Sequence, residues 1–391
     1  MSLSENSRAL IDALENLPIL DDRYRDMVCV NRASGADPRG MFSLVFMAFD
    51  IVNANQVALK FFDIDPDKVF NSYRVQSFRR EHEILQTLIG VRRCLQVMSG
   101  FKTYMLKAGG FDIPCQYFAV QWLDEEIDHY FELQDSIVAE VKLQLFHDIL
   151  LGVEALHGKE VSHRDLKKDN LRSIVEESAR LVIAIDLGTA ARSDTPALAP
   201  SYNASPVGAL WYSAPEAKFG LAGVREIGKY TDIFALGCML YELFNREYFF
   251  AEFLRINPSF SMVNTVFGLA VSQKTNDKDR LDALHAALDR HGKGMAAVTM
   301  IETDSSVPMG ISSILDELVQ SMTKFDYRSR PKSLGSVRLK VQSAIAVLRN
   351  NRLNRQRTEE TKARRIEKLK RIALKEQRLA DALQRRLANA K

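Results

Sequence analysis

The sequence predicts an α+β protein with two lobes, a small one built mainly from strands and a larger one that is mostly helical, followed by a basic C-terminal helix. Between residues 24 and 123, short runs rich in β-branched and aromatic residues indicate strands. Between 137 and 157, apolar residues recur at helical spacing. From 349 to 391 the chain has no Pro or Gly and is rich in Arg, Lys, Leu and Ala, which favours one long helix.

The composition is that of an ordinary globular protein. Its 391 residues, 46% of them hydrophobic and 26% charged, suffice for two lobes that each bury a core. No apolar run reaches about eighteen residues, and the first residues lack a basic segment followed by an apolar one, so we expect a cytoplasmic protein without a transmembrane segment. The four cysteines form no C-x-x-C pair, which argues against a zinc site or a disulfide framework.

Charge is distributed unevenly along the chain. Residues 351–391 carry 14 Lys or Arg and 5 Asp or Glu, a net charge of +9, so the rest must carry −6 to give the overall +3. The basic segment 349–391 allows three interpretations: a solvated helix, a self-associating or partner-binding helix or coiled coil through residues 350–391, or a contact with anionic membrane or nucleic acid. The first is favoured and the last is the weakest.

The elements of the first lobe can be placed from local pattern. Residues 1–24 predict an N-terminal helical extension that ends near Pro18 and packs on this lobe. Strands are expected over 42–49, 56–62 and 117–120, with one main helix around Glu81.

The second lobe is predicted to be mainly helical, beginning with a helix over 137–157. An insert is expected within 251–309, with a helix over 280–288 and a loop over 304–308. A surface elaboration is favoured for this insert over a substrate-docking element.

One stretch carries a specific chemical pattern. The residues from His163 to Asn170 read His-Arg-Asp-Leu-Lys-Lys-Asp-Asn, and Asp186-Leu187-Gly188 begins sixteen residues after Asn170. This is similar to the catalytic and metal-binding loops of a protein kinase, where one carboxylate meets a substrate hydroxyl while an amide and a second carboxylate hold Mg²⁺ on ATP phosphates.

Further motifs follow in the order of the same family. They are Val57-Ala58-Leu59-Lys60, the helical stretch 78–85 with Glu81, Ser213-Ala214-Pro215-Glu216, the stretch 230–237 with Asp232, and Arg328-Ser329-Arg330-Pro331. The chain therefore resembles the eukaryotic-type protein kinase family, serine/threonine branch, over residues 25–348. This resemblance implies a small antiparallel β lobe with one main helix at 25–123 and a larger helical lobe at 124–348.

The resemblance also implies ATP and Mg²⁺ as cofactors and a protein as substrate. Asp165 would accept or orient the hydroxyl proton, and Lys167 would stabilise the transferring phosphate. Asn170 and Asp186 would hold Mg²⁺. Lys60 would bind the α and β phosphates, held in place by Glu81.

The remaining expected site residues fall into two groups. The ATP pocket would further involve Gly40, Val45, Ala58, Val120, Gln121 and Leu123. Structural or regulatory roles would fall to Arg164, Glu216, Asp232 and Arg330. Because Arg164 precedes the catalytic aspartate, we expect activation by phosphorylation at Thr195, Ser201 or Ser205.

Two departures from the family pattern bear on activity. Pro38 and Ser43 stand where the glycine-rich loop usually has glycines, which predicts weaker or stiffer ATP binding. Ala209 replaces a threonine usual in serine/threonine kinases, whereas Lys167 fits the serine/threonine pattern.

Three functions remain open on these residues. An active Ser/Thr-directed protein kinase is favoured because the six motifs are retained. The alternative is a pseudokinase scaffold that recruits partners through the tail, and a third option is a kinase for a small-molecule hydroxyl. The acidic cluster Asp124, Glu125, Glu126 and Asp128 either selects basic substrates or forms a solvated turn, the latter being favoured.

Overall fold

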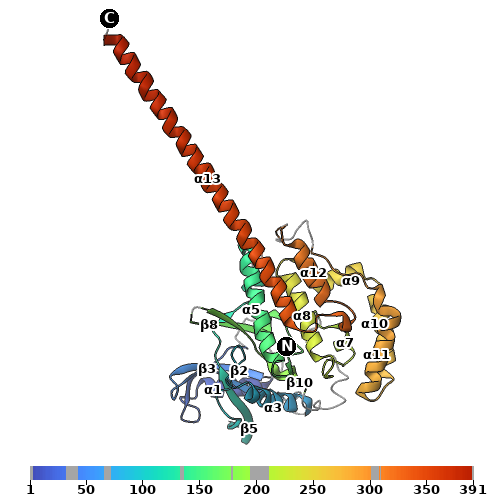
Figure 1. Ribbon diagram of the computed structural model, residues 1–391. Coiled ribbons are helices and arrows are strands. Elements are labelled where there is room, and N and C mark those ends of the chain that lie inside the picture. Colours follow the sequence, from blue (N-terminus) through green and yellow to red (C-terminus); the bar gives the residue numbers. More distant parts are fainter. Residues whose placement is uncertain are drawn as a thin grey trace.

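The computed structural model describes residues 3–31, 43–65, 72–132, 136–177, 179–193, 211–300, 308 and 310–389. A strand-rich N-terminal lobe lies beside a larger helical one, and a single long helix projects away from both (Figure 1). The small lobe contains an antiparallel sheet with the strand order β1-β2-β3-β5-β4. Its strands are β1 (Tyr24–Cys29), β2 (Ser43–Asp50), β3 (Asn55–Phe62), β4 (Lys102–Ala108) and β5 (Phe111–Gln121).

The two faces of this sheet belong to different hydrophobic cores, because successive side chains of a strand point to opposite sides. On β3, Leu59 and Phe61 pack into a core with helix α1 (Glu5–Glu15). Ala58 and Phe62 belong instead to the main core of the molecule, together with helix α3 (Ser72–Thr87). Lys60 lies between them on that second face.

Helix α1 is part of the small lobe. Ser4 caps its N-terminus by accepting the Ser7 N–H at 3.1 Å, and Leu10 and Leu14 are fully buried. The sequence predicted a helix ending near Pro18, and the helix ends at Glu15. The expected helix around Glu81 and the expected strands correspond to α3, β2, β3 and β5.

The large lobe is built around α8 (Gly228–Glu242), which is buried along almost its whole length. The other helices are α4 (His129–Glu132), α5 (Ala139–His157), α7 (Pro215–Lys218), α9 (Phe249–Ile256), α10 (Phe260–Ser272), α11 (Asp277–His291), α12 (Ser312–Met322) and α13 (Leu334–Asn389), with 3-10 turns η2 (Lys168–Asn170), η3 (Leu187–Thr189), η4 (Gly292–Gly294) and η5 (Tyr327–Ser329). Short strands pair as β6-β8-β9 and β7-β10: β6 (Glu125–Glu126), β7 (Val161–Ser162), β8 (Leu171–Glu176), β9 (Ala179–Ala184) and β10 (Ala191–Arg192).

Helices α9, α10 and α11 occupy most of the segment in which an insert was expected. Phe253, Phe260 and Phe267 from this segment are buried in the main core. The apolar side of the segment is thus integral to the large lobe. The helix expected over 280–288 lies within α11, whereas residues 304–307 of the expected loop are outside the described part of the chain.

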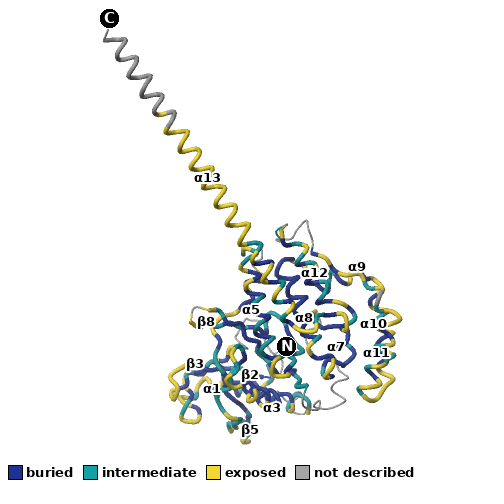
Figure 2. Tube along the Cα trace, viewed as in Figure 1, coloured by how far each residue is buried: buried dark blue, intermediate teal, exposed yellow. Residues whose placement is uncertain are grey.

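Helix α13 begins at Leu334 and continues without a break past the domain boundary predicted at 348–349. Its first turns pack along α5, where Glu140 pairs with Arg349 and Arg352 at 2.8 Å each. From Leu353 to Arg371 every residue is exposed (Figure 2).

Two further expectations concern the described residues as a whole. Cys29, Cys94, Cys115 and Cys238, all within the described residues, are buried and form no disulfide. Within the described ranges, no helix combines the length and apolar character needed to cross a membrane.

Candidate functional site

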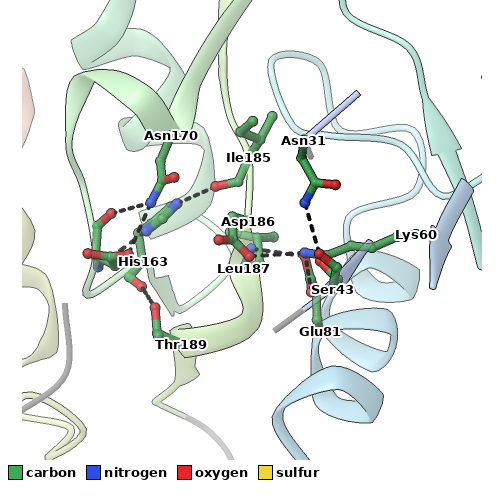
Figure 3. Close-up of polar contacts among 11 residues, drawn as sticks. Asn31, Ser43, Lys60, Glu81, His163, Asn170, Ile185, Asp186, Leu187 and Thr189 are labelled. Carbon is green, nitrogen blue, oxygen red and sulfur yellow. Dashed lines mark hydrogen bonds and ion pairs between the residues drawn. The ribbon is translucent and has the colours of Figure 1, made fainter. Parts of the chain in front are cut away.

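The predicted site lies where the two lobes meet, and Lys60 is at its centre (Figure 3). The Lys60 Nζ donates to both carboxylate oxygens of Glu81 at 2.7 Å and to Asp186 Oδ1 at 3.0 Å. These three residues come from β3, α3 and the turn after β9, so their meeting depends on the tertiary fold.

The charges in this cluster stabilise one another away from water. Burial by itself disfavours the Lys60 ammonium, but Asp186 and Glu81 outweigh that effect and raise the pKa of Lys60. Burial also opposes the charge of Asp186, and Lys60 reverses this and lowers the Asp186 pKa. One cation and one carboxylate of the site are therefore kept charged.

The turn after β9 is fixed by backbone geometry as well as by charge. Asp186 adopts a left-handed conformation with φ of 61°, and the next residue, Leu187, donates its N–H to Glu81 Oε1 at 3.1 Å. A Cβ at Gly188 would lie 3.5 Å from Asp186 Oδ1 and 3.6 Å from Glu81 Oε2, in ordinary contact with both carboxylates. Helix α3 thus holds both Lys60 and the turn that carries Asp186.

Asp165 and Asn170 lie together across from this cluster. The Asn170 Nδ2 donates to the Asp165 carbonyl at 2.8 Å and to Asp165 Oδ2 at 3.1 Å. The loop that carries them is tied to the Asp186 turn, because His163 Nε2 contacts the Ile185 carbonyl at 2.9 Å and Thr189 donates to the His163 carbonyl at 3.2 Å. The two loops form one hydrogen-bonded unit.

Asp232 binds the backbone of the loop that carries Asp165. Asp232 is only 1% exposed. Its carboxylate accepts the backbone N–H groups of His163 and Arg164, each at 2.8 Å, and lies 2.8 Å from His157 Nε2. The bonds support an unusual backbone, since Arg164 has a φ of 70°. Asp232 is on α8, so the most buried helix of the large lobe positions the loop.

Arg330 and Glu216 form a buried ion pair. Arg330 Nη1 and Nη2 donate to the two Glu216 oxygens at 2.5 and 3.0 Å, and both residues are almost fully buried. Arg330 also donates to the carbonyls of Lys324 and Tyr230 and lies over the ring of Phe234. The pair joins α7 to the segment before α13.

The residues expected around a nucleotide base are also brought together. Ala58 and Val120 are register partners on β3 and β5, and with Leu123 they are buried in one core cluster. Val45 lies opposite Lys60 on β2 and packs against this cluster, and Gln121 is half-buried at the end of β5. Val45, Ala58 and Val120 thus lie on the same face of the sheet as Lys60, whereas Gln121 is the register partner of Val57 and belongs to the opposite face.

Lys167 is described, whereas several other predicted residues are not. The nearest ion pair of Lys167 is with Asp169, at 3.8 Å. The positions Gly40, Thr195, Ser201, Ser205, Pro38 and Ala209 lie outside the described residues. Ser43, the other departure in the glycine-rich loop, is buried, and its carbonyl accepts from Asn31 at 2.8 Å.

The acidic cluster after β5 is largely engaged within the protein. Glu126 pairs with Arg172 at 3.3 Å, and Glu125 accepts from Ser173 at 2.8 Å and lies 3.8 Å from Arg180. Asp128 is buried. This arrangement leaves less negative charge for a basic substrate than the sequence suggested.

One contact beside Asp165 has no signal in the local sequence. Tyr212 and Asp165 line a common small pocket, and Tyr212 donates from its hydroxyl to Glu242 Oε2 at 2.5 Å. Burial raises the pKa of Glu242 to about 7. Glu242 stands at the end of α8, ten residues after Asp232. Its position could have been found only from the fold.

The site can be compared with known proteins. The family model of the protein kinase domain matches residues 38–339. Mitogen-activated protein kinase kinase kinase 3 of Homo sapiens is 24% identical over 264 residues, which cover 68% of this chain and 38% of that relative. Cyclin-dependent kinase 11B of Homo sapiens is 26% identical over 246 residues, 61% of this chain and 27% of the relative.

A third relative, CTD kinase subunit alpha of Saccharomyces cerevisiae, is 34% identical over 124 residues, 31% of this chain and 22% of the relative. The chain belongs to the protein kinase family, and its fold is the two-lobed α+β fold of that family. The matches cover 22% to 38% of the lengths of these three relatives.

Proposed function

We propose that this chain is an active protein kinase that transfers the γ-phosphate of ATP to serine or threonine hydroxyls. The observation that carries the proposal is the simultaneous bonding of Lys60 to Glu81 and Asp186, within the two-lobed fold. A lysine ammonium that two carboxylates hold in a fixed position is suited to binding a triphosphate. A protein that used the fold only for scaffolding would need none of the three residues.

Lys60 is proposed to hold the α and β phosphates, with Glu81 fixing its position. Asp186 and Asn170 supply oxygen atoms, which are the donors that Mg²⁺ prefers. Mg²⁺ bound there would neutralise phosphate charge. Val45, Ala58, Val120, Gln121 and Leu123 would surround the adenine, and Gly40 would cover the phosphates.

Asp165 is proposed to orient the substrate hydroxyl and accept its proton. The bond from Asn170 to Asp165 Oδ2 restricts the orientation of that carboxylate within its loop. Lys167, two residues further on, is proposed to meet the transferring phosphate. Its position supports serine or threonine as the acceptor, because it matches the pattern of that branch of the family.

Phosphorylation and partner binding are two further parts of the proposed function. Arg164 is half-buried, and desolvation lowers the pKa of its guanidinium, so a nearby anion would stabilise its charge. We therefore propose that a phosphate on Thr195, Ser201 or Ser205 pairs with Arg164. The basic helix beyond residue 352 is proposed to self-associate or bind a partner helix, and the protein is proposed to act in the cytoplasm.

Phosphate transfer from γ-labelled ATP tests the main proposal. We expect incorporation into a generic Ser/Thr substrate by the wild type, and loss of it in Asp165→Ala and Asp186→Ala, with Asp282→Ala on the exposed face of α11 as the matched control. Acid hydrolysis of the product identifies the acceptor. Absence of incorporation by the wild type, with no ATP binding, would support the pseudokinase alternative, for which the Pro38, Ser43 and Ala209 departures speak.

A further inference from the structure

The N-terminal helix makes a buried hydrogen bond to the residue that directly follows β3. Ser7 Oγ donates to Asp63 Oδ1 at 2.6 Å, and both residues are fully buried. The same Asp63 oxygen accepts the N–H of Asp65 at 3.3 Å, and Ser4 Oγ lies 2.6 Å from Ser7 Oγ. The contact therefore joins the first turn of α1 to the residues that directly follow β3.

Asp63 stands three residues after Lys60, and the end of β3 between them is fixed on both faces. On the α1 side, Phe61 stacks on Tyr117 with ring centroids 4.6 Å apart. On the other side, Phe62 meets Phe78 of α3 edge to face at 5.5 Å. Because Phe78 lies one helical turn before Glu81, a shift at the end of β3 is passed to the helix that carries the partner of Lys60.

The segment after α1 is fastened to the same sheet. Asp21 accepts a hydrogen bond from the Tyr117 hydroxyl and pairs with Lys102 at 2.9 Å. Tyr117 is the residue on which Phe61 stacks. Residues 5–21 thus hold β3 and its neighbours at two places, one of which is the Ser7–Asp63 bond.

We propose that Ser7 and Asp63 are positioning residues for nucleotide binding, so that the N-terminal helix sets the geometry of the Lys60–Glu81 pair. The proposal rests on the ATP binding proposed above. Removing the Ser7 hydroxyl would take the shorter of two hydrogen bonds from Asp63 Oδ1, leaving the longer one from the Asp65 N–H at 3.3 Å, and the buried carboxylate would shift to improve its remaining contacts. That movement would displace the end of β3 and loosen α3.

The test compares Ser7→Ala, Asp63→Ala and the double variant with Leu14→Ala. Leu14 is also fully buried under α1 but lies two turns from Ser7, so its loss destabilises the same interface without breaking the polar contact. Two readouts are used at a temperature where thermal unfolding shows all variants folded: the Kd for ATP with Mg²⁺, and amide hydrogen exchange of residues 72–87 without nucleotide.

We expect Ser7→Ala to raise the Kd for ATP about three- to tenfold. This range corresponds to the free energy of a charge-assisted hydrogen bond, of which a part reaches the nucleotide site. Exchange in α3 should become faster by a similar factor. The double variant should resemble either single one, since both break the same bond. Leu14→Ala should lower the unfolding midpoint while leaving the Kd and α3 exchange close to those of the wild type.

Unchanged α3 exchange in Ser7→Ala would overturn the positioning role, as would an equal effect in Leu14→Ala, which would show general loosening of the lobe. Additive effects in the double variant would also count against it. The exchange readout decides the coupling even if the wild type binds no ATP, and that last result would instead refute the proposed function.

Discussion

Arg330 and Glu216 form an ion pair from which water is almost entirely excluded, although 114 residues separate them in the chain. Two parallel hydrogen bonds and three backbone carbonyls satisfy the guanidinium. A buried pair of this kind depends on both partners, because either charge left alone would stay in a poorly solvated place.

Arg330→Ala is therefore expected to destabilise the protein by about 3–5 kcal/mol, by stranding the Glu216 carboxylate. Denaturant unfolding measures the loss. Arg328→Ala provides the control: Arg328 also pairs with aspartates, but it is partly exposed and should cost under about 1 kcal/mol. If the two variants lost similar free energies of unfolding, burial would not be the reason that the Arg330–Glu216 pair stabilises the protein.

Asp232→Asn should slow catalysis without weakening nucleotide binding. The amide would turn a donor toward the N–H groups of His163 or Arg164, at a cost of about 2 kcal/mol that distorts the loop carrying Asp165. Lys60 and Glu81 are on other elements and should keep their geometry. Steady-state kinetics should thus show kcat falling at least tenfold with the ATP Kd unchanged, and a selective rise in Kd would contradict this division of roles.

Glu242 predicts a dependence of stability on pH. Burial raises its pKa from 4.5 to about 7, which is partly opposed by the bonds from Tyr212 and the Phe249 N–H. The folded state therefore favours the protonated acid. The contribution of Glu242 to the free energy of unfolding is fully present below pH 4.5 and is lost as the pH rises through 7. The total loss is up to roughly 3 kcal/mol.

Glu242→Gln should remove this contribution, because the amide keeps an acceptor for Tyr212 and cannot ionise. Denaturant unfolding at pH 5 and pH 8 measures the effect. We expect the variant to equal the wild type at pH 5 and to be more stable than it at pH 8. A variant less stable at both values would mean that the ionised carboxylate is needed.

Gly152 should not tolerate a side chain. A Cβ there would lie 2.5 Å from the Val182 carbonyl oxygen, so α5 and β9 would have to separate. We expect Gly152→Ala to cost about 1–3 kcal/mol. Gly268→Ala is a matched helical control with its nearest atoms at 3.9 Å, and it should stabilise by about 0.5–1 kcal/mol. Thermal unfolding of both variants tests the contrast.

Ending the chain after Arg352 should leave the folded lobes intact. The residues Leu353 to Arg371 are exposed, whereas Arg349 and Arg352 still reach Glu140. The unfolding midpoint should change by less than about 2 °C. Sedimentation of the full and shortened chains then tests the proposed self-association: a monomer in both cases would exclude it at the concentration used.

Local pattern was sufficient for the elements near the site. The helix carrying Glu81, the strand carrying Lys60 and the buried helix carrying Asp232 all lie where periodicity and motifs placed them. The local sequence pattern was less informative about where each helix begins and ends. The N-terminal helix stops at Glu15, ahead of Pro18, and α13 begins at Leu334, well inside the segment assigned to the large lobe.

The sequence by itself determined the class of fold and the family, and it predicted the roles of Lys60, Asp165, Asn170 and Asp186, because these rest on side-chain chemistry at fixed spacing. Only the tertiary structure decided which charges are neutralised internally, as for Glu125 and Glu126, and which are held by distant partners. Contacts such as Ser7–Asp63 and Tyr212–Glu242 have no local signal. They arise where elements far apart in the chain pack together and a buried polar group must find a partner.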